Sequence, residues 1–301
     1  MTIQRVLVTG ATGYIGRQVR LAFEASGVEA WGLSRRAQGA RALQVDISDR
    51  ARLQAELQGF ACVVHCGYYS GHDPDTQRRV NVEGTRNVAE LALASGVDRL
   101  ITVSTSGVYG GKLGEGGGEG TIPVRPGSPS AKSRAAADCV IAEAGGTVVR
   151  PNLVVGPGDT LTIPPLLAGM RWTRSWIGDP DARISVIDVR SLANLVVGLV
   201  AAREAPPMLH AAHPRPVRAR TLLEPILGAA ELPVPDRCLP LAEAIRIGCD
   251  RGVSDRQIAM IGQHGWFRSD AIWAAAGVSF PSTFTLDDAT VAYYARQLRR
   301  R

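Results

Sequence analysis

The chain has 301 residues, of which 45% are hydrophobic and 21% are charged, a composition typical of a folded globular protein. It excludes disordered, collagen-like and coiled-coil chains. The net charge of +6 comes from scattered arginines, so we expect no nucleic-acid partner. Five cysteines with no Cys-x-x-Cys pair argue against a disulfide framework and a metal site. The sequence shows neither a signal-peptide pattern nor an apolar membrane span, which predicts a cytoplasmic protein without a membrane partner.

The first half of the chain alternates short β-branched runs with helical patterns, which predicts a doubly wound parallel sheet, the Rossmann fold. We expect this dinucleotide-binding domain to span residues 1–150. In residues 151–301 frequent prolines interrupt the elements, and this predicts a smaller, looser substrate-binding lobe with some segments returning to the first domain. The expected strands are 3–8, 29–33, 42–45, 62–65, 100–103 and 147–150, and the clearest helix is 76–95.

A glycine loop lies between the first strand and the first helix. Gly10, Gly13 and Gly16 suit a tight turn, the close approach of a phosphate and close helix packing, and the pyrophosphate is expected at the helix N-terminus. A tight turn without a chemical role is the alternative, but the strand before the loop and the helix after it favour dinucleotide binding. The remaining cofactor contacts expected from this loop are Thr12, Tyr14 and Ile15.

The end of the second strand indicates which dinucleotide is bound. An acidic residue there binds the ribose 2′-hydroxyl of NAD, whereas this sequence has Ser34, Arg35 and Arg36. Guanidinium groups suit the 2′-phosphate of NADP(H), which is therefore the predicted cofactor. A solvated basic loop is the alternative.

The stretch 110–120 contains seven glycines. Composition favours a disordered surface loop. Because the stretch follows the carboxyl end of a strand, a mobile lid over the ligand is the second interpretation.

In its order of motifs the sequence resembles the extended short-chain dehydrogenase/reductase family, the group related to NAD(P)-dependent epimerases and dehydratases. The resemblance implies adenine contacts from Asp46 and Ile47, and further cofactor contacts from Cys66, Gly67, Val103, Arg134 and Pro151. The motifs that carry it are 9–16, 46–47, 64–67, 81–85, 103–110, 150–151, 156–158, 187–189 and 267–294.

The family's catalytic set is a Ser or Thr after the fifth strand and a Tyr-x-x-x-Lys pair. Thr105 matches the first position, which polarises a carbonyl oxygen. Ser130 stands at the Tyr position and Arg134 at the Lys position, so the resemblance carries an atypical catalytic set. An unperturbed serine is a much weaker acid than a phenol, although Arg134 can still hold a ribose hydroxyl. Lys132 is interpreted as a surface residue or a ribose contact.

A different proton donor is therefore needed if a proton is transferred. Tyr68 and Tyr69 follow the fourth strand and Tyr109 follows the fifth, so each can face the nicotinamide, and His72 can approach from a loop. For any single tyrosine, packing with an outward hydroxyl is the competing interpretation.

The position of the polar sugar contact in nucleotide-sugar members carries Leu153, which favours an apolar or natural-product-like ketone as the small-molecule substrate. Helices 76–95 and 131–144 are expected to form a homodimer interface, as the resemblance implies. The aromatic residues that can line an apolar pocket or pack in a core are Trp172, Trp176, Trp266 and Phe267.

Three functions remain open after the sequence. The first is an NADP(H)-dependent oxidoreductase or related tailoring enzyme that acts on a small carbonyl compound with a non-standard proton donor. The second in rank is a redox-silent NADP-binding sensor or scaffold, which Ser130 and Arg134 favour. The third is a nucleotide-sugar epimerase or dehydratase.

Overall fold

The computed structural model describes residues 5–111 and 113–299. At its centre lies a seven-stranded sheet in the order β12-β7-β5-β4-β1-β2-β3, in which every neighbouring pair is parallel. The predicted fold class is confirmed, and a seventh strand that the sequence did not predict completes the sheet. The strands are β1 (Arg5–Thr9), β2 (Glu29–Ser34), β3 (Ala42–Gln44), β4 (Cys62–His65), β5 (Arg99–Val103), β7 (Thr147–Pro151) and β12 (Met208–Ala211).

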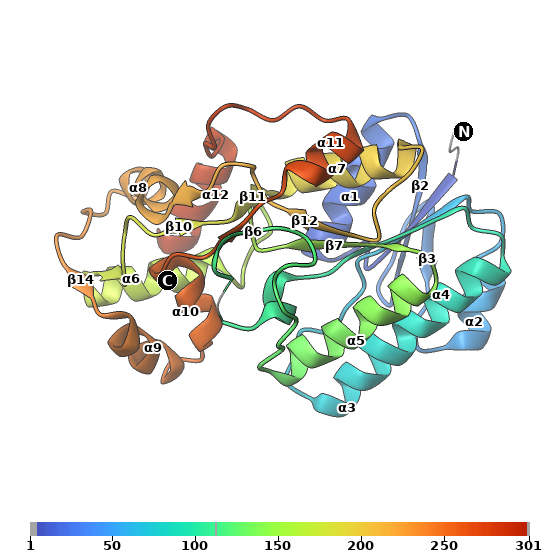
Figure 1. Ribbon diagram of the computed structural model, residues 1–301, viewed down its shortest axis with the longest axis horizontal. Coiled ribbons are helices and arrows are strands. Elements are labelled where there is room, and N and C mark those ends of the chain that lie inside the picture. The colour runs from blue at the N-terminus through green and yellow to red at the C-terminus, as the bar shows by residue number, and fades with distance from the viewer. Residues whose placement is uncertain (1–4, 112, 300–301) are drawn as a thin grey trace.

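Helices cover both faces of this sheet (Figure 1). On one face α1 packs against α7, and α7 packs against α11. On the other face α5 packs against α4 and against the π-helical segment that precedes α4. The first set is α1 (Tyr14–Ala25), α7 (Val189–Ala201) and α11 (Asp270–Ala276). The second is α2 (Arg50–Glu56), α3 (Pro74–Thr76), the π-helix η1 (Gln77–Gly84), α4 (Thr85–Ala94) and α5 (Pro129–Glu143).

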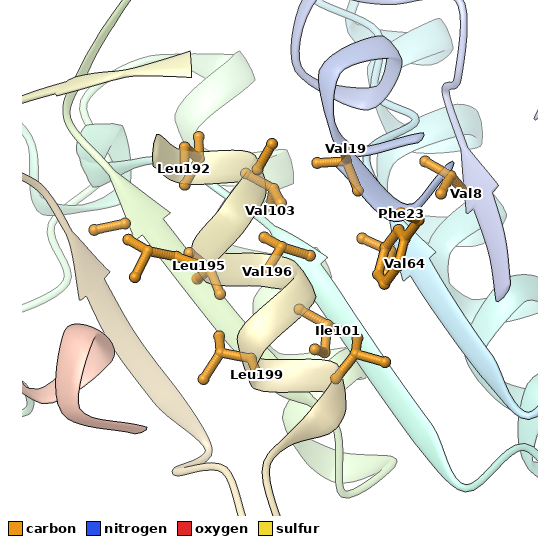
Figure 2. Packing of buried hydrophobic residues seen from close by; sticks show 14 of the residues in the cluster. Val8, Val19, Phe23, Val64, Ile101, Val103, Leu192, Leu195, Val196 and Leu199 are labelled. Carbon is orange, nitrogen blue, oxygen red and sulfur yellow. The ribbon is translucent and has the colours of Figure 1, made fainter. Parts of the chain in front are cut away.

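The β-branched strands divide their side chains between two cores. In β1, Val6 and Val8 point toward α1 and α7, whereas Leu7 belongs to the core beneath α4 and α5. This is the two-residue alternation of a strand buried on both sides. Figure 2 shows the first core, where Val196 on α7 lies close to Val64 of the sheet and to the α1 side chains.

Residues after 150 build a second lobe and also return to the sheet. The lobe has its own buried cluster, in which Tyr294 is the largest fully buried side chain. No described helix is long and apolar enough to cross a membrane. The lobe contains α6 (Ile163–Thr173), α8 (Ala219–Ala229), α9 (Leu241–Cys249), α10 (Asp255–Gly262) and α12 (Asp288–Arg299). Its short strand pairs are β8 (Leu153–Val155) with β11 (Val186–Asp188), β9 (Trp176–Ile177) with β14 (Cys238–Leu239), and β10 (Arg183–Ile184) with β13 (Val217–Arg218).

The glycine-rich stretch differs from the expectation of a disordered loop. Within it, β6 (Glu115–Gly117) pairs in parallel with β15 (Trp266–Phe267). The backbone amide of Trp266 donates to the Gly114 carbonyl, and that of Arg268 donates to the Gly117 carbonyl. These backbone bonds hold the stretch against the second lobe, which composition alone does not reveal.

The two helices expected at a dimer interface, α4 and α5, lie side by side on the same face of the sheet (Figure 1). Leu93 on α4 keeps 54% of its surface exposed, and Ala136 on α5 is also exposed. The homodimer stays a prediction.

The core under α7 gives a test of this packing. Leu195 is fully buried, so Leu195→Ala removes transfer energy and leaves a cavity, and we expect it to lower the free energy of unfolding by about 2–5 kcal/mol. The matched control is Leu161→Ala, because Leu161 is 63% exposed; its effect should stay within about 0.5 kcal/mol. Urea unfolding measures both. Equal stability of the two variants would contradict the assigned core.

Candidate active site

The loop after β1 brings three backbone segments close together. Gly10 has φ of 65°, and a Cβ atom there would lie 2.6 Å from the carbonyl oxygen of Cys66 in the loop after β4. A Cβ atom on Gly16 would overlap the Gly10 carbonyl, which lies directly beneath α1. Only glycine at these two positions permits both approaches. The turn is closed by a hydrogen bond of 2.9 Å from the Gly13 amide to the Gly10 carbonyl.

A cavity of about 300 Å³ opens beside this loop at the carboxyl ends of β1, β2 and β4. Ten of the residues predicted to bind the cofactor line it: Gly10, Thr12, Gly13, Ser34, Arg35, Arg36, Asp46, Ile47, Cys66 and Gly67. The tyrosines Tyr68 and Tyr69 also belong to its wall. An elongated dinucleotide fits the donors here, because glycine amides suit a pyrophosphate and the wall runs from the loop to the end of β2.

The other predicted cofactor residues do not line this cavity. Tyr14 packs its ring near Gly158, and burial, followed by the charge of Asp159, raises the pKa of its phenol. Ile15 and Gly16 sit in the first turn of α1. Val103 and Pro151 are buried at the ends of β5 and β7.

A buried histidine supports the loop from below. The Thr9 hydroxyl lies 2.6 Å from His65 Nδ1, and His65 Nε2 lies 2.9 Å from the Thr85 hydroxyl. The Thr85 hydroxyl donates to the Asn81 carbonyl. Burial, and secondly the charge of Arg134, lowers the pKa of His65 to about 3, so the ring is neutral at pH 7.

The basic pair at the end of β2 faces solvent at the rim of the cavity. Arg35 and Arg36 are both exposed, and the Arg36 amide donates to the Ser34 hydroxyl at 3.2 Å. Among the described residues neither guanidinium takes part in a salt bridge. Both are therefore available to an anion.

Thr105 sits between β5 and the short 3-10 helix η2 (Ser106–Tyr109) and is half-buried. Its hydroxyl oxygen accepts a hydrogen bond of 3.0 Å from the Gly107 amide, which leaves the hydroxyl proton free to be donated. Ser130 is half-buried near the start of α5, and its carbonyl accepts from Ser133. Lys132, two residues further along, is exposed.

Arg134 and Tyr68 form one unit. The guanidinium carbon of Arg134 lies 3.3 Å from the centroid of the Tyr68 ring, and Arg134 Nη2 donates to the Val103 carbonyl at 2.8 Å. The Tyr68 hydroxyl is 2.6 Å from the Thr102 hydroxyl on β5. Burial raises the pKa of Tyr68 to about 12, although the charge of Arg134 opposes the shift.

Tyr109 lies in a buried polar cluster below the site. Its hydroxyl is 2.7 Å from His210 Nε2 and accepts from Arg150 Nη1 at 3.0 Å. Arg150 also forms a buried ion pair of 2.9 Å with Asp138. This phenol is engaged within the protein interior, whereas Tyr69 lines the cavity and packs its ring near Gly71. His72 is exposed.

Sequence reasoning missed a second cluster beside Thr105. Arg256 reaches from α10 to η2, where its Nη2 donates to the Ser106 hydroxyl at 3.2 Å. Ser106 donates to Asn152 Oδ1 at 2.6 Å, and Asn152 donates to the Ser185 carbonyl. No sequence motif marks Arg256, because it lies 150 residues from its partner.

The match to known proteins agrees with this geometry. Residues 6–208 match the family described as the NAD dependent epimerase/dehydratase family. The chain belongs to this family. It therefore uses a nicotinamide dinucleotide, and family members include oxidoreductases, epimerases and dehydratases.

Two curated relatives are reductases by name. The chain is 28% identical over 221 residues to the 4-hydroxy-2-methyl-3-oxo-4-farnesyl-3,4-dihydroquinoline-1-oxide ketoreductase of Stigmatella aurantiaca, a match that covers 67% of this chain and 65% of the relative. It is 26% identical over 275 residues to the 2-alkyl-3-oxoalkanoate reductase of Stenotrophomonas maltophilia, with 82% of each chain covered. The fold is similar to the Bordetella bronchiseptica enzyme WbmH in complex with NAD+, with a TM-score of 0.75, 22% identity and 98% of each chain covered.

The buried histidine predicts a pH dependence of stability. The pKa of His65 is lower in the folded state than in the unfolded chain, so its contribution is complete above pH 6.5 and is lost as the pH falls toward 3. We expect this residue alone to reduce the free energy of unfolding by about 2 kcal/mol between pH 7.5 and pH 5. His65→Gln should flatten that part of the curve, measured by urea unfolding at each pH.

The matched control is His72→Gln, since His72 is an exposed histidine near the same cavity. It should keep the dependence of the wild type. A His65→Gln curve parallel to that of the wild type would contradict the assignment.

Proposed function

We propose that the chain is an NADP(H)-dependent oxidoreductase that reduces a carbonyl group in a small, natural-product-like substrate. The observation that carries this proposal is the placement of Thr105, whose hydroxyl proton is free, at the carboxyl edge of the same sheet as the dinucleotide cavity. The two relatives described above are named a ketoreductase and a reductase, which supports the direction of reaction.

The preference for NADP(H) rests on Ser34, Arg35 and Arg36. These three residues line the end of the cavity at β2, and neither guanidinium forms a salt bridge among the described residues. The charge of Arg35 helps to lower the pKa of Asp46 on the same wall. A 2′-phosphate placed there receives charge-assisted hydrogen bonds, whereas the 2′-hydroxyl of NAD finds no carboxylate at the end of this strand.

The residues around Thr105 prepare the carbonyl for reduction. When bound, NADPH supplies a hydride to the carbonyl carbon. The Thr105 hydroxyl donates to the carbonyl oxygen, and its orientation is set by the bond from the Gly107 amide. Arg134 donates to the carbonyl of Val103, two residues before Thr105. Its positive charge stabilises the negative charge that develops on the substrate oxygen.

Tyr69 is the proton donor that we propose in place of the missing tyrosine. The hydroxyls of Tyr68 and Tyr109 are both taken up by hydrogen bonds inside the protein. Tyr69 lies on the cavity wall, and its backbone is held on both sides by the Asn81 amide group. These bonds fix the backbone of Tyr69 at the cavity wall, and its phenol packs beside Gly71.

The second candidate is a redox-silent NADP-binding sensor or scaffold. The stacking of Arg134 on Tyr68 favours this candidate, because the guanidinium is engaged by the Tyr68 ring. A nucleotide-sugar epimerase or dehydratase ranks last, because Leu153 is fully buried and offers no polar contact to a sugar diphosphate.

The cofactor preference can be measured directly. We expect NADPH to bind at least tenfold more tightly than NADH, because each charge-assisted phosphate contact is worth about 1.5–3 kcal/mol. Arg35→Ala and Arg36→Ala should each reduce this ratio by weakening NADPH alone. Arg246→Ala, an exposed arginine on α9 in the second lobe, serves as the control and should keep it. Equal dissociation constants of NADPH and NADH for the wild type would overturn the preference.

The proposed catalytic roles predict effects of different size for variants of Thr105, Tyr69 and Tyr109. Thr105→Val, which removes only the hydroxyl, should lower kcat about 10²-fold or more, whereas Thr105→Ser should retain most of it. Tyr69→Phe should lower kcat about 10²–10⁴-fold. Tyr109→Phe is the control, since its hydroxyl lies in the buried cluster and its loss should affect stability more than turnover.

These variants are to be assayed with NADPH across a panel of ketones. Turnover that survives both Thr105→Val and Tyr69→Phe would refute the assigned roles. Tight NADPH binding without any hydride transfer would favour the redox-silent protein instead.

A further inference from the structure

The guanidinium of Arg256 is built into the site rather than left on the surface. It lies flat against Gly107, where a Cβ atom would come within 2.7 Å of Arg256 Nη1, so that glycine admits the close approach. Its helix α10 begins with a capping box in which Ser254 and Gln257 bond each other's backbone. The position of Arg256 is therefore defined at both the helix and the guanidinium.

No carboxylate forms a salt bridge with this guanidinium among the described residues. The neighbouring Asp255 carboxylate accepts a hydrogen bond from the Arg256 backbone amide. Asp138, a buried acid on α5, is paired with Arg150. Burial, and secondly the like charge of Arg134, lowers the pKa of Arg256. The charge of Asp255 opposes this shift. A partly buried guanidinium under the influence of a second cation is better stabilised when an anion binds it.

A small hollow of about 20 Å³ adjoins the guanidinium. On this measure a single water molecule needs about 10–15 Å³, so the hollow has room for one oxygen atom of a bound anionic group and is too small for a nucleoside diphosphate. The chain of bonds from Arg256 through Ser106 to Asn152 orients these side chains. The residues that line it include Ser106, Gly110, Asn152, Arg256, Gln263 and His264.

We propose that this hollow is an anion subsite, and that the carbonyl substrate carries a carboxylate which pairs with Arg256. The inference rests on the proposed reductase function and adds the chemical class of its substrate. The carboxylate satisfies the free N–H groups of Arg256, and Arg134 adds long-range attraction. Ser106, which lines the hollow, directly follows Thr105 in the chain, so the proposed subsite adjoins the segment that carries the Thr105 hydroxyl. Arg256 is then a specificity-determining residue and takes no part in proton transfer.

The test compares acids with their neutral counterparts. The wild type is assayed with NADPH and 3-oxooctanoate or 4-oxooctanoate, each against its methyl ester. We expect at least one acid to have kcat/KM roughly tenfold or more above its ester, with the difference mainly in KM. Arg256→Gln should remove this ratio by raising KM for the acid alone, and Arg256→Lys should retain part of it.

The control is Arg246→Gln, an exposed arginine on α9 in the same lobe, which should keep the wild-type ratio. A variant that merely loosens the lobe would lower kcat/KM for acid and ester alike. Thermal unfolding of each variant separates such a loss of stability from a loss of recognition. If Arg256→Gln lowers kcat/KM equally for acid and ester, Arg256 has only a structural role and the subsite proposal is wrong.

A binding measurement separates this inference from the reductase proposal. Octanoate and octanamide are titrated by calorimetry into the NADPH-loaded protein and into its Arg256→Gln variant. Octanoate binding that depends on Arg256, without turnover of any ketone, would support the subsite and overturn the reductase. Turnover of acid and ester at equal kcat/KM, unchanged in Arg256→Gln, would support the reductase and overturn the subsite.

Discussion

Backbone crowding at the carboxyl ends of β1 and β4 is the constraint on which the site depends. Gly10 touches the loop after β4, and Gly16 brings α1 down onto the Gly10 carbonyl, so the helix, the loop and the sheet meet without intervening side chains. The cavity exists because these three backbones define one of its walls. Underneath, the neutral ring of His65 joins Thr9 to Thr85, which ties this wall to the helix on the opposite face. Pyrophosphate binding and sheet packing therefore share one structural requirement.

The arginines in the protein interior and those at the site differ in whether they have carboxylate partners. In the interior, Arg150 is paired with Asp138 and bonded to Tyr109, so its charge and its donors are satisfied. At the two ends of the site, arginines stand without carboxylate partners among the described residues: the pair after β2 and the pair formed by Arg134 and Arg256. Such an arrangement suits anion binding, because a guanidinium without a salt-bridge partner can form charge-assisted hydrogen bonds with an anion. It supports the two proposed anions, the 2′-phosphate of the cofactor at the end of β2 and a carboxylate of the substrate at Arg256.

Local patterns predicted the parts of the site that one strand and its loop determine. The six expected strands are present, and the residues after β1, β2 and β4 meet at one cavity because parallel strands bring their carboxyl ends to the same edge. The rest depends on distant contacts. β12 is short and follows two prolines, so its pattern is weak. The Tyr109 hydroxyl is oriented by His210, and the Arg256 guanidinium is oriented by Ser106. Both contacts join residues far apart in the sequence, so no local pattern contains them.

The resemblance assigns Ser130 and Arg134 to the positions of the family's tyrosine and lysine, and for the proposed reaction these two residues have to be considered together. A guanidinium keeps its proton at any physiological pH, so Arg134 contributes charge and orientation but cannot relay a proton. Arg134 stacks on the Tyr68 ring, and the Tyr68 hydroxyl is bonded to Thr102. The Tyr68 phenol is therefore engaged and is not the proposed proton donor. In the proposed reduction the oxyanion formed beside Thr105 is stabilised mainly by electrostatics, and its proton comes from a group on the cavity wall. Recognition of an anionic substrate suits such a site, because the same positive field that binds the carboxylate also favours the developing oxyanion.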